Sequence, residues 1–246
     1  MTDLTVVQMI SLMLVFVWSG FVRAGLGFGG AALALPFALI VVESGQVAPP
    51  LLLMQLILFS GLHTVQHWDN VDRRYLGCLA ALLVLPVLAG VYSLIKLPNH
   101  GLMTLVYLFV LGIAIQYIVQ MEFKTVSRAV DGVLLMLEGY VLGSTTAGDP
   151  PIVAVSMRYV HPSQVRDTLL CLWLIFAALN LVVLIRAEVD LQWRAQVWLL
   201  PATVVGHLIG DRVHGRLIAM QNAVFDRVLG VALFLVTILG LVKLWR

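Results

Sequence analysis

Long apolar runs separated by short polar gaps follow one another along the whole chain. Most of the runs have about the 20 residues that a helix needs to cross a bilayer. The runs cover residues 4–22, 30–42, 47–67, 75–95, 101–121, 129–146, 150–160, 165–185, 195–211 and 223–243. The pattern predicts an all-α, polytopic membrane protein with about 8–10 transmembrane segments.

Two of the runs, 30–42 and 150–160, are shorter than the others. A helical crossing normally needs about 17–25 residues. Each short run follows a glycine-bearing turn, "GLGFGG" (25–30) in one case and "STTAGDPP" (144–151) in the other. We therefore expect two half-helices or re-entrant helices, each with its N-terminus at a glycine turn.

The chain divides into two groups of five runs, and the groups resemble each other at a nearly constant offset of 118 or 119 residues. We interpret residues 1–122 and 123–246 as two transmembrane repeats. An odd number of crossings in each half would invert the second repeat relative to the first; the alternative is a parallel repeat with one non-crossing run per half. The matching pairs are Gly20-Phe21-Val22 with Gly139-Tyr140-Val141, Gly29 with Gly148, Val71-Asp72 with Val189-Asp190, and "VLGIA" from Val110 with "VLGVA" from Val228.

Composition and charge support a membrane setting. The chain is 61% hydrophobic and 11% charged, whereas soluble domains are about half apolar and a quarter charged. The net charge of +2 and the scattered basic residues give no indication of nucleic-acid binding. Cys78 and Cys171 lie inside apolar runs, so we expect neither a disulfide nor a metal pair.

The distribution of Lys and Arg predicts the orientation. Loops with more basic residues remain in the cytoplasm. This rule places both termini outside, in agreement with inverted repeats. The cytoplasmic group is Arg73, Arg74, Lys124, Arg128, Arg158, Arg166, Arg212 and Arg216, and the outer group is Lys96, Arg186, Arg194, Lys243 and Arg246.

The stretch "GLGFGG" matches the G-x-G-x-x-G pattern of dinucleotide-binding domains, but the preceding run is a membrane helix rather than a strand. Free N–H groups and the helix dipole at a half-helix N-terminus attract anions instead. We therefore predict an anionic substrate at the two turns; close helix packing is the alternative role of the glycines. The predicted binding residues are Gly25, Gly27, Gly29 and Gly30 in the first turn, and Thr145, Thr146, Gly148 and Asp149 in the second.

Three stretches resemble the sulfite exporter TauE/SafE family, also called the 4-toluene sulfonate uptake permeases: "GLGFGGAALALP", "AGDPPIVAVSM" followed by "VRDTLLCLW", and the ending from "GHLIGDRVHG" to "LFLVTILG". The resemblance covers essentially the whole chain. It implies a permease of the bacterial inner membrane for sulfite, sulfonates or sulfoacetate. One departure is Asp149, where the family usually has the second glycine of Gly-Gly-Pro-Pro; a carboxylate there repels an anion unless it is protonated, paired or turned away.

Several polar side chains lie within the apolar runs. Glu138 has Ser19 as its repeat counterpart, and we predict that it couples transport to protons; a neutral or arginine-paired structural residue is the alternative. Arg23 could pair with Asp149 or the substrate, or anchor the helix at the interface.

Gln55 and His63 share one face of the third run, and Asn180 lies in the corresponding run of the second half. We include all three among the predicted substrate-binding residues, with helix contacts as the alternative. His63 and His67 have no third ligand at a recognised spacing, so no metal site is predicted.

The sequence thus predicts a secondary transporter of small sulfur-containing anions that works by alternating access between two repeats. We expect no cofactor and no enzymatic activity, since no catalytic spacing of residues appears. A cation or metal-ion permease is the main alternative; an intramembrane enzyme and a membrane scaffold are others. The expected partners are the small anion and the lipid bilayer, with a homodimer as one possible assembly.

Overall fold

The computed structural model describes residues 4–26, 29–120, 127–146, 150–220 and 223–246. Within these ranges the chain is α-helical and contains no strand, as the apolar runs predict. The elements are α1 (Val6–Leu26), α2 (Gly30–Val42), α3 (Ala48–His67), the 3-10 turn η1 (Trp68–Asn70), α4 (Arg73–Lys96), α5 (Asn99–Val119), α6 (Arg128–Thr145), α7 (Pro150–Ser156), α8 (Pro162–Arg186), α9 (Trp193–Met220) and α10 (Ala223–Leu244).

Six helices in the described ranges are long and apolar enough to cross a membrane, namely α1, α3, α4, α5, α8 and α10. The two predicted short helices are also present. Helix α2 has 13 residues, which is a rise of about 20 Å, and α7 has seven. Neither can cross a hydrocarbon core of about 30 Å.

Helix α9 extends to Met220, nine residues beyond the predicted run. Its last turns carry Asp211, Arg212 and His214. Apolarity marks where a segment leaves the membrane, whereas backbone hydrogen bonds continue the helix into the polar region. The sequence pattern therefore placed the end of this element too early.

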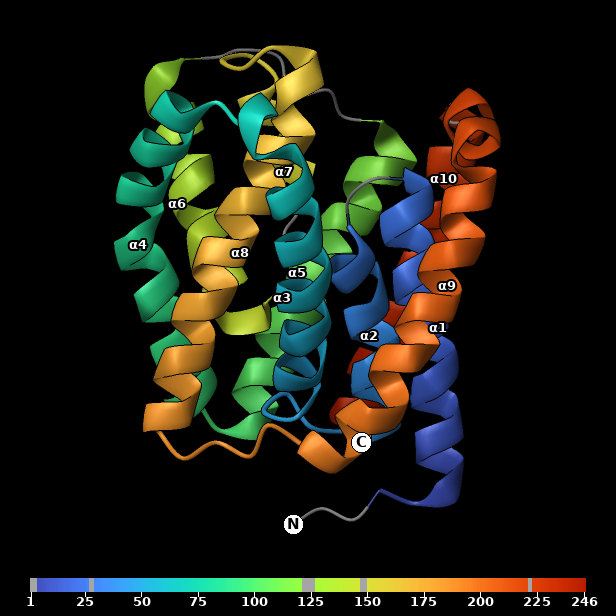
Figure 1. Cartoon of the computed structure of the whole chain (residues 1–246). Helices are drawn as coiled ribbons and strands as arrows, with labels where there is room; N and C mark the ends of the chain where they lie inside the picture. The colour runs from blue at the N-terminus through green and yellow to red at the C-terminus, as the bar shows by residue number, and fades with distance from the viewer. Residues whose placement is uncertain (1–3, 27–28, 121–126, 147–149, 221–222) are drawn as a thin grey trace.

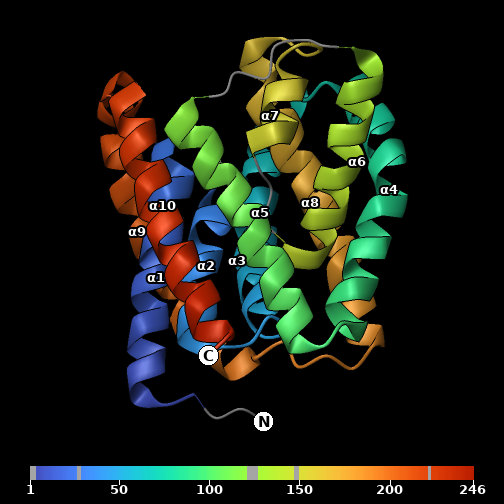
Figure 2. The same cartoon turned by 180° about the vertical axis from the view of Figure 1, so that it is seen from behind.

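The helices form an upright bundle in which α1, α3, α5 and α9 run in one direction and α4, α6, α8 and α10 run in the other (Figures 1 and 2). We call the end that carries η1 the η1 end, and the end where α1 begins and α10 ends the opposite end. Helix α1 packs along α9, α4 along α6, α5 along α10 and α3 along α8. Each of these pairs joins one helix from the first half of the sequence to one from the second.

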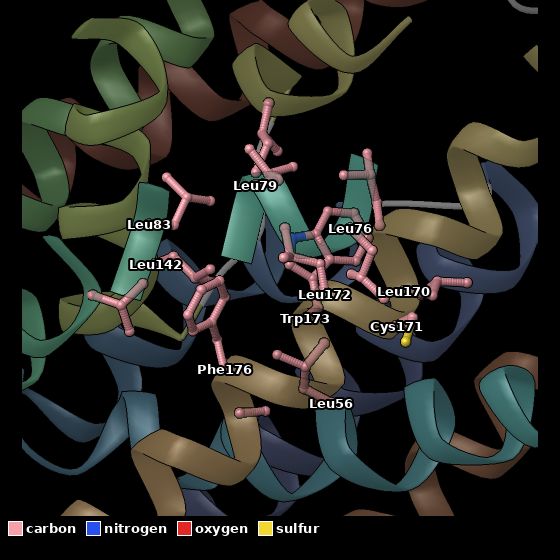
Figure 3. Packing of buried hydrophobic residues seen from close by; sticks show 14 of the residues in the cluster. Leu56, Leu76, Leu79, Leu83, Leu142, Leu170, Cys171, Leu172, Trp173 and Phe176 are labelled. Carbon is pink, nitrogen blue, oxygen red and sulfur yellow. The ribbon is translucent and has the colours of Figure 1, made fainter. Parts of the chain in front are cut away.

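The buried apolar residues form two clusters. One lies mainly between α4, α6, α7 and α8 and contains Trp173 and Phe176, which Figure 3 shows among leucines of α3, α4, α6 and α8. The other lies between α1, α2, α5, α9 and α10. Helix α3 contributes Leu53 and Leu56 to the first cluster and Leu51 and Leu52 to the second. Helix α3 is therefore the shared wall between them.

Glycines allow two of the helix pairs to cross at backbone contact. A Cβ atom on Gly206 of α9 would overlap the carbonyl of Val17 on α1, and one on Gly143 of α6 would overlap the carbonyl of Val87 on α4. Small residues have this role where membrane helices approach closely. At these two crossings, glycine therefore has the alternative role named above, which is to allow close helix packing.

Candidate functional site

The N-terminus of α2 begins at a glycine that the backbone requires. Gly29 precedes the helix with φ 75°, in the left-handed region that glycine occupies without strain. A Cβ on the next residue, Gly30, would come within 2.6 Å of the Ser19 carbonyl oxygen and 2.8 Å of Arg23 Cβ. The two glycines therefore let the start of α2 lie directly against the last turns of α1.

A small cavity lies at this helix start, between helices of both sequence halves. It leaves about 10 Å³ for the centre of a water molecule, which is room for about one water. We call it the Arg23 cavity. Its lining residues are Arg23 of α1, Gly29, Gly30 and Ala31 at the start of α2, Leu56 of α3, and Leu170 and Trp173 of α8.

Arg23 brings a positive charge into this cavity. Its side chain is 6% exposed, and its Nε has no hydrogen-bond partner. Its guanidinium carbon lies 5.9 Å from the centre of the Phe59 ring, a cation–π distance. No carboxylate in the described part of the chain forms an ion pair with it. A buried guanidinium is costly unless an anionic group lies beside it, so the arrangement is suited to an anionic ligand.

Trp173 supplies a second donor that the sequence analysis did not identify. The residue is 4% exposed, lines the Arg23 cavity, and has an indole Nε1 with no hydrogen-bond partner. Buried tryptophan N–H groups usually find an acceptor. In the sequence, Trp173 is one more large residue in the apolar run of α8, and nothing local distinguishes it.

Gln55 lies one layer behind the cavity. Its Nε2 donates to Ser19 Oγ at 2.9 Å, and that hydroxyl donates to the Gly30 carbonyl at 2.9 Å. Thr203 Oγ1 of α9 lies 3.3 Å from Gln55 Oε1. These fully buried groups join α1, α2, α3 and α9, so Gln55 holds the start of α2 in place rather than lining the cavity.

The described residues of the second turn lie elsewhere along the same two helices. Thr146 Oγ1 donates to the Pro49 carbonyl of α3 at 3.0 Å, and Asn180 Nδ2 of α8 lies 3.5 Å from the Leu142 carbonyl of α6. Pro49 is seven residues from Leu56, and Asn180 is seven residues from Trp173, which is about 10 Å of helix in each case. The contacts of Thr146 and Asn180 therefore lie about 10 Å from the Arg23 cavity along α3 and α8.

Other predicted residues have local roles or fall outside the described ranges. Thr145 Oγ1 donates to the Val141 carbonyl of its own helix at 2.8 Å. The Gly25 carbonyl, at the end of α1, lies 2.8 Å from His214 Nδ1 of α9. Gly27, Gly148 and Asp149 lie outside the described residues.

His63 lies toward the η1 end, seven residues beyond Leu56 on α3. Its Nε2 is 2.6 Å from Asp167 Oδ1 of α8, and Asn70 also donates to this carboxylate. His67 stacks on His63 with ring centres 4.2 Å apart. His63 therefore joins α3 to α8 at one end of the bundle and does not line the Arg23 cavity.

A second polar cluster closes the same end of the bundle. Asp131 of α6 pairs with Arg158, and the Tyr159 hydroxyl donates to Asp131 Oδ2 at 2.9 Å. This hydrogen bond raises the pKa of Tyr159, because the phenol loses its favourable contact with the carboxylate when it ionises. The cluster ties the segment after α7 to α6.

Glu138 lies in α6 with its side chain 2% exposed. The next residue, Gly139, meets Leu83 and Pro86 of α4. Glu138 is not among the residues around the Arg23 cavity. Ser19, its counterpart in the predicted repeat, does belong to the polar network behind that cavity.

Comparison with known proteins supplies the family. Neither the curated proteins nor the solved structures contain a match to the chain. The model of the family described as "Sulfite exporter TauE/SafE" matches residues 12–240, which include every helix from α2 to α9 and most of α1 and α10. The chain therefore belongs to the TauE/SafE sulfite exporter family, a family of membrane transporters.

Proposed function

We propose that the protein is a secondary transporter of small sulfur-containing anions and that the Arg23 cavity binds the anionic group. The observation that carries this proposal is Arg23, a buried cation that has no carboxylate partner in the described residues and lines a cavity at the start of α2. A residue with a positive charge, the start of a helix and a residue with an indole N–H all line one cavity. This combination is suited to an oxyanion.

The energetics favour a ligand-dependent site. Leaving one charge buried and unpaired costs about 3–5 kcal/mol. A bound oxyanion offsets this cost through charge-assisted hydrogen bonds to the guanidinium and through the positive end of the α2 dipole. The ligand-free site is therefore destabilised by the buried charge, and binding of the anion offsets this cost.

The cavity has to open to admit the anion, because it has room for about one water. Helix α3 offers a polar route from Leu56 toward the η1 end through Ser60 and Thr64, whose buried hydroxyls have no hydrogen-bond partner. The contact between His63 and Asp167 lies at the end of this route. We infer that separation of α3 from α8 there opens the cavity to one side of the membrane.

The pairing of helices supports alternating access by inverted repeats. Helix α1 packs along α9, and their repeat counterparts α6 and α4 pack along each other; α3 with α8, and α5 with α10, are counterparts that pair directly. A two-fold axis between the repeats exchanges the α1–α9 pair with the α6–α4 pair. The same axis maps the α3–α8 pair and the α5–α10 pair each onto itself. The first half begins at the opposite end and the second at the η1 end (Figure 1), as expected for an axis in the membrane plane.

Charge supports an orientation with the η1 end in the cytoplasm. Arg73, Arg74, Arg128 and Arg166 lie at or near helix starts of that end, whereas Lys96, Arg186 and Lys243 lie at the opposite end. We propose the bacterial inner membrane as the location. A homodimer stays a prediction.

The proposal is tested by flux in proteoliposomes that contain the purified protein. We expect uptake of radiolabelled sulfite that unlabelled sulfite or a small sulfonate inhibits, and no uptake of divalent metal ions. The described residues contain no group of three His, Cys, Asp or Glu side chains that could hold a metal ion. Metal flux without sulfite flux would favour the metal-ion permease instead.

Glu138 is our candidate for proton coupling. A carboxyl group buried in a membrane helix is stable when protonated and can ionise when water reaches it. We predict that Glu138→Gln keeps sulfite binding but loses the dependence of flux on a pH gradient. Glu188→Gln, at an exposed carboxylate of the opposite end, is the matched control. A folded Glu138→Gln protein with normal coupling would exclude this role.

A further inference from the structure

The side chains of the described residues around the Arg23 cavity include hydrogen-bond donors and no acceptor. Arg23 and Trp173 have only donors in their side chains, and the start of α2 presents backbone N–H groups. Ala31, Leu56 and Leu170 contribute apolar side chains. An anion in this cavity can therefore accept hydrogen bonds but finds no side-chain acceptor among the described lining residues.

The two carbonyls nearest the helix start each already accept a hydrogen bond. The Gly29 carbonyl accepts from the Leu33 N–H at 2.9 Å. The Gly30 carbonyl accepts from Ser19 Oγ at 2.9 Å, and Gln55 holds that hydroxyl from the other side. The buried network behind the cavity thus occupies an acceptor position of the Gly30 carbonyl that would otherwise be open to a ligand.

We infer that the Arg23 cavity selects its ligand by protonation state. It takes compact oxyanions without an O–H group, such as the sulfite dianion, sulfate or a small sulfonate, and it rejects anions of the same shape that retain a proton, such as hydrogen phosphate. This inference rests on the proposed function and specifies the substrate class of the same site.

The physical reason is the cost of a buried O–H group with no acceptor. Such a group loses its hydrogen bonds to water on binding and gains none, which corresponds to a loss of about 10- to 100-fold in affinity. The same reasoning applies to sulfite itself, whose protonated form is disfavoured. Sites that discriminate by an unpaired buried polar group are more selective than sites that discriminate by size.

Trp173 is the donor that α8 contributes to this arrangement. Its N–H comes from α8, whereas Arg23 and the α2 start come from the first half of the chain. A hydrogen bond to a charged acceptor is among the stronger ones. Trp173→Phe retains the ring and removes the donor, so we expect about 10-fold weaker binding of sulfate. Trp198→Phe, at an exposed position of α9, is the control and should change nothing.

The test is a calorimetric titration of the purified full-length protein with two matched pairs of anions. Sulfate is compared with phosphate at about pH 8, where phosphate has lost its second proton and keeps one. Methanesulfonate is compared with methylphosphonate at a pH where the latter is a monoanion with one O–H group. We expect the proton-free member of each pair to bind at least about 10-fold more tightly.

Each outcome decides between the inference and the proposed function. Equal affinity within either pair would overturn selection by protonation state but leave an anion transporter in place. No binding of any of the four anions, together with no sulfite flux, would overturn both. If Trp173→Phe fails to fold, the wild-type comparison of the pairs still decides. A folded Trp173→Phe protein with wild-type sulfate affinity would remove Trp173 from the site.

Discussion

Replacing Arg23 by methionine is expected to abolish anion binding and flux while raising the thermal stability of the ligand-free protein. Arg23 is 6% exposed and, in the described part of the chain, has no carboxylate partner. Removing one partner of a buried charge pair costs about 2–5 kcal/mol of binding, which is a loss of about 30-fold or more. Methionine fills a similar volume without a buried charge, and such replacements often stabilise a fold.

The opposite signs of the two effects distinguish a binding residue from a structural one. A structural arginine would lower the melting temperature when it is replaced, and activity would fall with the amount of folded protein. Arg23→Lys should keep the charge but lose the planar fork of donors, and should bind sulfite at intermediate strength. Arg186→Met, at an exposed arginine near the end of α8, is the control for charge removal. Wild-type sulfite affinity in Arg23→Met would contradict the site.

Replacing Gly143 by alanine is expected to be the most destabilising methyl addition among the glycines of α6. A Cβ at this position would overlap the carbonyl of Val87 on α4. Extra methyl groups in a packed core cost about 1–3 kcal/mol. A backbone carbonyl cannot rotate out of the way as a side chain can, so we expect the upper end of this range, about 3 kcal/mol or more.

The same helix provides the control. A Cβ on Gly132 would meet nothing within 4 Å, and alanine is the better helix former by about 1 kcal/mol. We expect Gly132→Ala to retain or raise the melting temperature in detergent and Gly143→Ala to lower it or prevent recovery of monodisperse protein. Equal melting temperatures for the two variants would show that α4 and α6 do not cross at backbone contact.

The helices of this fold follow closely from the sequence, because the membrane imposes their length and apolarity. The bounds of α2 are those predicted, since Gly30 begins the apolar run and Glu43, with φ 56°, ends the helix. The polar end of α9 was missed because hydropathy does not record where backbone hydrogen bonds stop. The start of α2 at a glycine turn was predicted because glycine and helix starts have local signatures, and its role in anion binding stays a prediction.

The remainder of the candidate site depends on which helices meet, and local pattern does not contain that information. Trp173 reaches the cavity only because α8 lies beside the start of α2. Gln55 and His63 were predicted to share one face of α3, yet Gln55 bonds to Ser19 of α1 and His63 contacts Asp167 of α8. The sequence identifies the hydrogen-bonding residues of a membrane helix as candidates for a polar role. Their hydrogen-bond partners are known only from the tertiary structure.

The most direct test of the central claim is an anomalous-scattering structure of the protein with selenite, at an alkaline pH at which selenite is the dianion. Selenite has the shape of sulfite, and its heavier atom can be located independently of the surrounding density. We predict a selenium peak in an enlarged Arg23 cavity, with selenite oxygens within hydrogen-bond distance of the Arg23 guanidinium and Trp173 Nε1. An ordered selenite bound elsewhere in the bundle, with the Arg23 cavity still closed, would contradict the assignment of this site.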